Sequence, residues 1–422
     1  PRSRGLGDVY KRQVLGSKAN HSLIEKMRGK EIDYILNRDS FPLVISGTLG
    51  SGRKEMTANL AIHNIRHKAP FVYLDGTGSS DTYWRLYEAA AHLDSSDNFY
   101  VINIVHSQTE VDSGEKLSHT FDPINPLVGN SPAFVTLFGP RIGPMIHHLA
   151  LCEHENGNLV TIDHLTNYCS LTWLQEALSN DYYGSAHYKI REYKDLTLDT
   201  RIHFFNCQEV FNFRSSFEGL ACVSTNPDIS FDEIYKQSKY LLVMLPALEL
   251  DPDALNIYAT VMMLLLEQSR IHQPVDNLPT EFLYNVMAHH ADVAFLLESN
   301  APANTVHSIE SFDQLASIPY HAHSVLAEKM KSALVMNYSP SFEQDTLDAF
   351  GRFENFHKGF LIKAKKRLAT WNAIPFGAIL RVVDSMVMGH AKHSEIIRGR
   401  TESIAPVSEA RLSRVRLIGE DI

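Results

Sequence analysis

The stretch that decides the fold is FPLVISGTLGSGRKEMT, residues 41–57. Its first part, FPLVIS, is a short apolar run typical of a buried strand. Gly47 and Gly52 follow at the spacing of the phosphate-binding loop G-x-x-x-x-G-K-[ST]. Residues 55–67 then carry apolar side chains at helical spacing. The order strand, glycine loop and helix is the context that a nucleotide-binding loop requires, so it predicts a P-loop domain.

The two positions after the second glycine depart from this motif. Arg53 stands where the motif has lysine, and Lys54 stands where it has a hydroxyl residue that holds Mg²⁺. Arg53 keeps the charge but has a planar fork in place of a compact ammonium, and Lys54 offers no oxygen to a metal. Aligning Lys54 with the motif lysine does not restore the motif, because Glu55 then takes the hydroxyl position. One residue of helix also turns the side chain by about 100°, so the lysine would point away from the phosphates.

The loop nevertheless keeps residues that can bind an anion, because backbone N–H groups at a helix N-terminus attract phosphate. The candidate ATP-binding residues are Gly47, Thr48, Gly50, Ser51, Gly52, Arg53, Lys54 and, after the next strand, Asp75. Binding of Mg²⁺ with ATP is doubtful on these residues, since neither cation of the loop can hold the metal.

Beyond the loop, strand-like and helix-like segments alternate. Strands are predicted at 71–74, 99–104, 240–245, 281–287, 304–309 and 332–337, and helices at 19–37, 81–92, 252–269 and 341–353. The stretch 130–235 breaks this rhythm and has a mostly helical pattern. Together these segments predict an α/β fold, with a mainly parallel sheet, helices on both of its faces and an α-rich insertion.

These patterns divide the chain into six segments. The divisions are 1–13, an adapter-derived segment; 14–40, a helical lead-in; 41–130 and 236–355, two parts of the α/β domain; 131–235, the α-helical insertion; and 356–422, a helical, basic segment and tail. Residues 3–13, SRGLGDVYKRQ, resemble a translated sequencing-library adapter. We therefore expect the chain to be a fragment whose natural part begins near Val14.

Composition limits the classes of function. The net charge of −10 disfavours nucleic-acid binding by bulk charge, and the basic run 358–367 is more typical of a solvated helix face. The apolar runs 240–248 and 257–266 are much shorter than the roughly 20 residues of a membrane helix.

The chain has four cysteines, and their spacing fits neither a zinc site nor a disulfide framework. This pattern suits a reducing cytoplasm. The four are Cys152, Cys169, Cys207 and Cys222.

Two further patterns invite a metal site and are better explained otherwise. Asp163 follows an apolar run, but a helical pattern begins directly after it, so we interpret it as the helix N-cap. The histidine groups at 147–148, 289–290 and 321–323 have no acidic partners at fixed spacing. Surface or hydrogen-bonded histidines are the simpler interpretation.

Four segments resemble the coupling proteins of type IV secretion systems. They are GTLGSG at 47–52, FVYLDGTGSSDTYWRLYEAA at 71–90, FDPINPL at 121–127 and YLLVMLPALELDPDALNIYATVMMLLL at 240–266. The likeness covers about residues 41–355 and is closest to the Dot/Icm-type branch, whose members carry an all-α insertion in a RecA-like motor domain. Its most specific part is LPALE, residues 245–249.

The resemblance implies partners and a location. Motor domains of this family form hexamers on the cytoplasmic side of the bacterial inner membrane, where N-terminal helices anchor them. A homo- or hetero-hexamer with coupling-protein relatives is therefore expected, together with secretion-system subunits and protein substrates. DNA is possible as a substrate but is not favoured by the net charge, and membrane attachment would come from a missing N-terminal region.

The same resemblance exposes losses in the catalytic positions. The family ends the strand equivalent to 281–287 with an Asp-Glu pair, for metal and for water activation, whereas Asn285 and Val286 stand there. Glu310 aligns with a family glutamine after the next strand. The family's DGKGD-like loop becomes DGTGS at 75–79, without its lysine and second acid. These losses predict a pseudo-ATPase scaffold with no confident catalytic residue.

Two alternatives remain open on the residues alone. An active ATP-driven translocation motor for protein or DNA would need Arg53 to bind nucleotide and a neighbouring subunit to supply metal ligands. A non-hydrolysing nucleotide-sensing module would need only the glycines and the two cations, which still form an anion site. Hydrolysis that depends on Arg53 would favour the motor, and ATP binding without Mg²⁺ dependence would favour the sensor.

Overall fold

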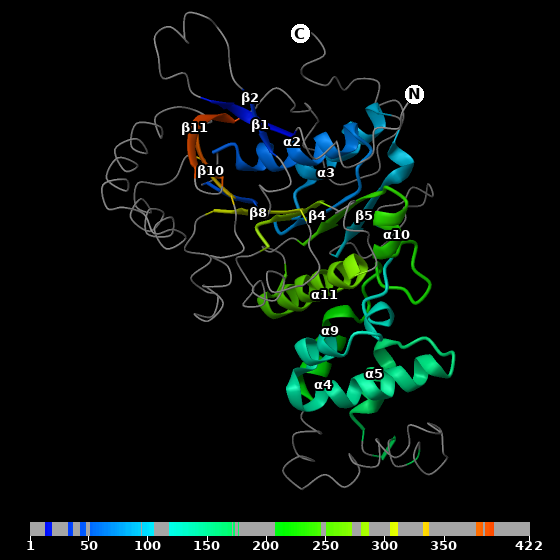
Figure 1. The fold of residues 1–422 in the computed structure, drawn as a ribbon. Helices are drawn as coiled ribbons and strands as arrows, with labels where there is room; N and C mark the ends of the chain where they lie inside the picture. The colour runs from blue at the N-terminus through cyan, green and yellow to red at the C-terminus, as the bar shows by residue number, and fades with distance from the viewer. Residues whose placement is uncertain are drawn as a thin grey trace, which may run out of the picture. The chain divides into compact units, whose positions relative to one another are not determined.

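A computed structural model provides the structure of the protein. The residues that it describes are 13–18, 33–36, 43–47, 51–93, 95–104, 118–170, 172–173, 176, 207–245, 250–271, 280–286, 304–310, 332–336, 377–382 and 385–391. The chain divides into two compact units (Figure 1). We call 1–101, 232–248 and 272–422 the sheet unit, and 102–231 with 249–271 the helical unit.

The strands form an 11-stranded sheet in the order β2-β1-β11-β10-β9-β3-β8-β7-β4-β6-β5. Its central strands are β3 (Leu43–Ser46), β4 (Phe71–Asp75), β6 (Tyr240–Met244), β7 (Thr280–Tyr284), β8 (Asn304–Ile309) and β9 (Ser332–Met336), and β5 (Phe99–Asn103) lies at one edge. The run from β9 to β6 is parallel throughout. The carboxyl ends of these strands therefore share one edge of the sheet, where ligands bind in open α/β sheets.

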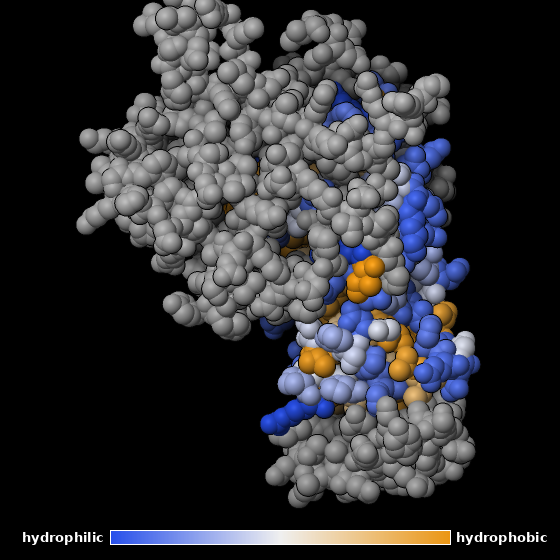
Figure 2. Space-filling model, in the orientation of Figure 1, coloured by the Kyte–Doolittle hydropathy of each residue, from blue (hydrophilic) through white to orange (hydrophobic). Residues whose placement is uncertain are grey.

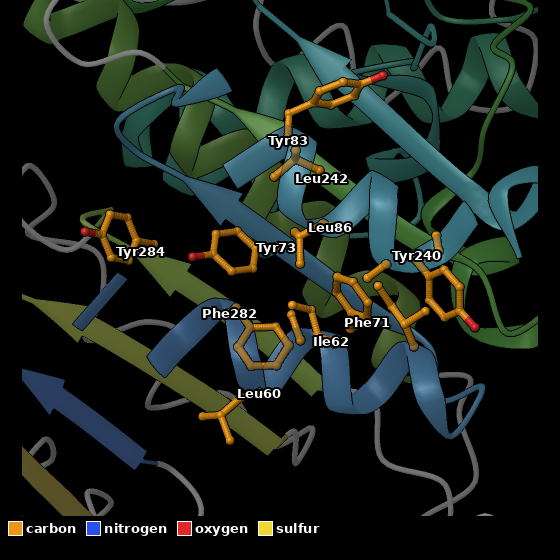
Figure 3. Close-up of a cluster of buried hydrophobic side chains, with 14 of the residues drawn as sticks. Leu60, Ile62, Phe71, Tyr73, Tyr83, Leu86, Tyr240, Leu242, Phe282 and Tyr284 are labelled. Atoms are coloured by element: carbon orange, nitrogen blue, oxygen red, sulfur yellow. The ribbon is translucent and has the colours of Figure 1, made fainter. Parts of the chain in front are cut away.

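Two helices cover one face of the sheet. These are α2 (Arg53–Arg66) and α3 (Ser80–His92), which pack against each other and over an aromatic-rich core (Figure 3). In this core the Phe71 ring lies 5.4 Å from the Tyr240 ring and 5.7 Å from the Phe282 ring, measured between centroids. Such contacts add to the burial of large apolar surface, so the core holds β4, β6 and β7 in register.

The opposite face is covered in part by α10 (Phe231–Lys236). Successive strand residues point to opposite faces, so Glu281 faces away from the core that contains Phe282. Its buried carboxylate accepts a hydrogen bond of 2.9 Å from the hydroxyl of Tyr235 in α10. The acidic side chain inside the sheet thus has a hydrogen-bond partner, as a buried polar group requires.

The helical unit is built from α4 (Ser131–Glu155), α5 (Ile162–Tyr168), α9 (Gln208–Phe217), α11 (Pro252–Ile271) and the short η5 (Asn125–Leu127). Its core includes a ring cluster in which Phe217 lies 4.8 Å from Phe213 and 5.1 Å from Tyr258. The Tyr258 hydroxyl donates to the backbone oxygen of Ser216. Figure 2 shows isolated apolar patches on the unit's described surface, where Leu159, Phe211 and Ile271 are exposed.

The α/β RecA-like fold class predicted from the sequence is confirmed by the parallel strands and their covering helices. Predicted segments 71–74, 240–245 and 304–309 form β4, β6 and β8. The helical unit has bounds of its own: it includes 102–130 and 249–271, which lie outside the helical insertion predicted over 131–235. Two hydrogen bonds, from Phe121 N to Cys222 O and from Ser224 N to Phe121 O, tie this earlier segment into it.

Two predictions of helix are wrong in the described part of their ranges, and the remainder of each range lies outside the described residues. Within 19–37, Asp33–Leu36 form β2, which pairs antiparallel with β1 (Gln13–Lys18). Within 356–422, β10 (Gly377–Val382) and β11 (Ser385–Ala391) form an antiparallel hairpin, and β10 also pairs with β9. Short, β-branched and apolar runs on both sides of a two-residue connection favour a hairpin over a helix once a sheet edge is free to pair.

Several predictions fall outside the described residues: most of the adapter-like segment 3–13, the helix at 341–353, the basic run 358–367 and the tail 395–422. Among the helices that the structure does describe, none is both long and apolar enough to cross a membrane.

The N-cap of α5 is another correction. Thr161, not Asp163, occupies that position: the Thr161 hydroxyl accepts from the backbone of His164, and His164 Nδ1 accepts from the backbone N–H of Thr161 at 3.0 Å. Asp163 lies in the first turn instead, where its charge still suits the positive end of the helix dipole.

Candidate nucleotide-binding site

The backbone around the glycine loop has the arrangement predicted from the motif. β3 leads directly into Gly47, whose N–H donates to the carbonyl of Ile309 at the end of β8 over 3.2 Å. Gly52 caps α2 in the left-handed conformation, with φ 88° and ψ 6°, which a residue without a side chain adopts at little cost. Thr48 and Gly50 lie outside the described residues. The strand before residues 48–50 and the helix N-terminus after them are therefore in place.

Arg53 is the first residue of α2, and its side chain is turned into the protein. It is 3% exposed. One terminal nitrogen, Nη1, donates to Asn285 Oδ1 at 2.6 Å and to Ser308 Oγ at 3.3 Å. The guanidinium carbon lies 4.7 Å from the centroid of the Tyr284 ring, a cation–π contact. Arg53 therefore spans the carboxyl ends of β7 and β8.

Among the described residues Arg53 forms one ion pair, and that contact is long and partly exposed. Glu310 follows β8, and its Oε1 lies 3.9 Å from Arg53 Nη2, with the Glu310 side chain 52% exposed. Burial lowers the pKa of Arg53, while the nearby Tyr284 and Glu310 act in the opposite direction. Neutral acceptors and an aromatic ring, rather than a buried ion pair, hold the guanidinium in place.

Lys54 is directed toward the other neighbour of α2. Its Nζ donates to Ser79 Oγ at 2.6 Å and lies 3.0 Å from Asp81 Oδ2 in the first turn of α3. Arg85 reaches the same carboxylate oxygen at 2.9 Å. Burial alone would raise the pKa of Asp81, but the hydrogen bonds and charges of Lys54 and Arg85 outweigh it and hold that pKa below its ordinary value. Lys54 is thus part of an ion cluster that joins α2 to α3.

Asp75 ends β4, and its buried carboxylate is occupied by its own loop. Oδ1 accepts from the backbone N–H of Thr77 at 2.9 Å and from its hydroxyl at 2.6 Å, and Oδ2 accepts from Ser79 N at 3.3 Å. Gly76 follows, and its N–H donates to the Tyr284 carbonyl at 2.8 Å. A Cβ on Gly76 would lie 2.7 Å from the Asn285 carbonyl oxygen, so this close approach of β4 to β7 requires glycine.

The end of β7 lacks the groups that a Mg²⁺ site needs. Asn285, in the left-handed conformation with φ 56°, has a neutral amide whose oxygen is engaged by Arg53. Val286 is buried and apolar. Mg²⁺ prefers carboxylate oxygens in octahedral geometry, and a guanidinium beside the site adds repulsion. In the described residues no three His, Cys, Asp or Glu side chains come together as metal ligands. The residues present therefore do not fit Mg²⁺.

The structure brings together some of the site residues predicted from sequence and separates others. Arg53, Asn285 and Glu310 meet at the ends of β7 and β8, whereas Lys54 and Asp75 both meet Ser79. The partners that sequence reasoning missed are Thr57, Ser79, Asp81, Tyr284 and Ser308. Ser79 and Asp81 carried a usable signal, because they sit at the predicted start of the helix after Asp75-Gly76.

Comparisons with known proteins place this geometry in a fold family. No protein-family model matches the chain, and no curated protein sequence does. Among solved structures, the bacterial conjugative coupling protein TrwB in its unbound form matches with a TM-score of 0.62 at 11% identity, over 92% of this chain and 95% of that one. The chain has a RecA-like fold.

Two further matches agree with this assignment. TrwB in complex with a non-hydrolysable ATP analogue matches with a TM-score of 0.63 at 12% identity, over 92% of this chain and 96% of that one. VirB4 of Thermoanaerobacter pseudethanolicus matches with a TM-score of 0.52 at 11% identity, over 90% of this chain and 96% of that one. At such identities the likeness establishes the RecA-like fold and leaves the chemistry to the residues described above.

Proposed function

We propose that the protein is a coupling-protein-like subunit of a type IV secretion system that has lost ATP hydrolysis and acts as a scaffold in the complex that recruits or translocates substrates. The fold shared with TrwB and VirB4 supports the first half. The hydrogen bond between Arg53 and Asn285 carries the second.

That hydrogen bond opposes catalysis in two ways. A working P-loop needs a lysine ammonium that reaches the β- and γ-phosphates and a strand-end carboxylate that serves the metal. Here the cation at the lysine position is bound to the very strand end that should carry the carboxylate, and that end carries an amide. Nucleotide would have to break contacts to Asn285 and Ser308 before Arg53 could reach it.

Lys54 supports the same proposal. Its ammonium is held between Ser79 and Asp81, and its position in the motif belongs to the hydroxyl that binds Mg²⁺. TrwB, by contrast, has been observed with ADP and Mg²⁺. We therefore expect this chain to have lost Mg²⁺-dependent nucleotide binding while it keeps the scaffold of the fold.

As a scaffold, the subunit would join a homo- or hetero-hexamer with active relatives on the cytoplasmic side of the inner membrane. The net charge of −10 favours protein over DNA as the recruited substrate. Sedimentation of the purified chain, alone and mixed with an active coupling protein, tests the assembly. A chain that stays monomeric in both samples contradicts it.

A Mg²⁺-independent anion-binding module is the second candidate, and one observation favours it. Ser51 Oγ and Arg53 Nε are buried without a hydrogen-bond partner in the described part of the chain, and both lie at the N-terminus of the 14-residue helix α2. Unpaired buried polar groups at a helix N-terminus would gain from an oxyanion.

The experiment that separates these functions is calorimetry of ATP binding to the full chain, with and without Mg²⁺. The comparator is the double variant Arg53→Lys, Lys54→Thr, which restores the motif. A matched control makes the same two chemical changes at exposed positions outside the loop, Arg141→Lys and Lys236→Thr.

We expect no heat of binding from the natural chain or the control and Mg²⁺-dependent binding by the repaired loop. Mg²⁺-dependent binding by the natural chain would contradict the scaffold proposal and support a motor. ATP binding by the natural chain that does not depend on Mg²⁺ would favour the anion-binding module. If none of the three proteins shows a heat of ATP binding, replacing Arg53 and Lys54 is not enough to restore nucleotide binding to the loop.

A further inference from the structure

The helical unit brings together two cysteines that lie far apart in the sequence. Cys169 is the C-cap of α5, and Cys207 is the N-cap of α9. The two helices pack against each other, and the two thiols are joined by a side-chain hydrogen bond. Both side chains are buried, at 6% and 0% exposed. Sequence spacing alone indicated no disulfide, because the pairing depends on how the helices pack.

We propose that Cys169 and Cys207 form an oxidisable pair, which a small-molecule disulfide such as oxidised glutathione converts into a disulfide bond between α5 and α9. Thiols in hydrogen-bond contact are already close to the separation of bonded cysteines, whose Cβ atoms lie about 3.8 Å apart. Both cysteines are free thiols in the structure described here.

The chemistry balances in two exchange steps. The thiolate of Cys169, the more exposed of the pair, attacks one sulfur of oxidised glutathione and releases a glutathione thiolate. The thiolate of Cys207 then attacks Sγ of Cys169 in this mixed disulfide and releases the second glutathione. The protein loses two electrons and two protons, and one oxidised glutathione becomes two thiols.

The surroundings make the reaction slow and its product protected. The hydrogen bond to Cys207 and then burial raise the pKa of Cys169, so its reactive thiolate is scarce while the helix ends are closed. Attack therefore requires local opening of the cap at the end of α5. The same burial shields the finished disulfide from reducing thiols.

The bond would also affect a hollow of about 530 Å³ in the helical unit. Thr161, Ile162 and Asp163 at the start of α5 and Arg214 and Phe217 at the end of α9 line this hollow. The two cysteines sit at the opposite end of each of these helices. Oxidation would therefore fix two elements of the hollow's wall to each other.

The test exposes the full folded chain to oxidised glutathione, blocks the remaining thiols with an alkylating reagent in denaturant, and maps the peptides by mass spectrometry. Cys169→Ser and Cys207→Ser remove the pair. Cys152→Ser and Cys222→Ser are matched controls, because both residues are buried cysteines of the same unit, and burial raises the pKa of Cys222 to about 12.

We expect one cross-linked peptide pair, Cys169 with Cys207, with a mass lower by about two hydrogens. It should form in the unsubstituted chain and in both controls and be lost in the Cys169 and Cys207 variants. The thermal midpoint of the helical unit should rise by about 5 °C or more, because the bond closes a long loop.

Three results would overturn the proposal: stable glutathione adducts on Cys169 or Cys207 without ring closure, equal oxidation of Cys152 or Cys222, or four unmodified thiols in the folded chain under conditions that oxidise the urea-unfolded chain. Mapping of the unsubstituted chain decides between these outcomes even if a serine variant fails to fold.

Discussion

β4 and β7 lie side by side in the sheet, and their carboxyl ends differ in an instructive way. β4 ends in Asp75, whose carboxylate is satisfied within its own loop. β7 is followed directly by Asn285, whose amide oxygen accepts a hydrogen bond from Arg53 of another element. Between them, Gly76 keeps the two backbones in close contact. The two strand ends thus keep a close backbone contact, while one brings a carboxylate and the other a neutral amide.

This difference shows that fold and chemistry depend on different residues. The close approach of the strands depends on a glycine and on backbone hydrogen bonds, whereas catalysis depends on side chains that can change without moving the backbone. Asn285 after β7 and Arg53 in the loop are hydrogen-bond partners, so a substitution at either residue also affects the other. Substitutions at Gly76 and at Arg53 can therefore measure separately how stability depends on the backbone contact and on the side-chain contact.

The largest effect is expected for Gly76→Ala. Its new Cβ would lie 2.7 Å from the Asn285 carbonyl oxygen and 3.0 Å from that of Tyr284, and both are backbone atoms that cannot move aside cheaply. We expect a loss of about 2–4 kcal/mol in the free energy of unfolding. Denaturant titration measures it, with Gly129→Ala as control, because nothing lies within 4 Å of a Cβ there. Equal losses of stability in Gly76→Ala and Gly129→Ala would contradict the view that the contact between β4 and β7 requires glycine.

Arg53→Ala is expected to have the next largest effect, about 2–3 kcal/mol. The change removes a charge-assisted hydrogen bond to Asn285, leaves a partly buried amide oxygen without this donor, and empties the space over the Tyr284 ring. Arg66→Ala, at the exposed end of the same helix, is the matched control and should cost little. A loss no greater than that of the control would show that Arg53 does not connect the loop to β7.

The smallest effect is expected for Lys54→Ala, about 1 kcal/mol at neutral pH, because its pair with Asp81 is partly exposed, at 25% and 19%. The pKa of Asp81 is lowered in the folded state, so the pair stabilises above the ordinary carboxyl pKa of 3.8 and its contribution fades as pH falls through the lowered value.

Urea titrations at neutral pH and near about pH 3 should therefore show the cost of Lys54→Ala shrinking in acid. Lys236→Ala, which breaks an exposed pair with Asp232 of 3.2 Å, should cost less than Lys54→Ala at neutral pH. If the loss of unfolding free energy in Lys54→Ala is the same at both pH values, Lys54 acts through packing rather than through its charge.

The central strands were readable from sequence because they are buried on both faces. Phe71–Asp75 and Tyr240–Met244 are buried at every position, which gives the continuous apolar runs of a parallel sheet. The hairpin of β10 and β11 was not readable in the same way. Its strands depend on pairing with β9 and β1, which local sequence does not report.

The sequence pointed to some residues of the candidate site but not to their contacts, and it missed partners such as Tyr284 and Ser308. The motif identified Arg53 and Lys54 as departures, and the family resemblance identified Asn285. That Arg53 turns toward Asn285 while Lys54 turns toward Asp81 follows from the helical rotation of adjacent residues combined with the positions of β7 and α3. Only the three-dimensional arrangement supplies those positions.

The link between Arg53 and the strand ends also bears on how the chain is made. Arg53 and Asn285 are 232 positions apart, and Arg53 and Ser308 are 255 apart. During synthesis the loop and α2 leave the ribosome first, and residues 102–231 of the helical unit are translated before β7 and β8 exist. Contacts of such separation form slowly because they close long loops. The guanidinium of Arg53 therefore stays solvated and without these partners until β7 and β8 have been synthesised. Its burial is a late event in biosynthesis.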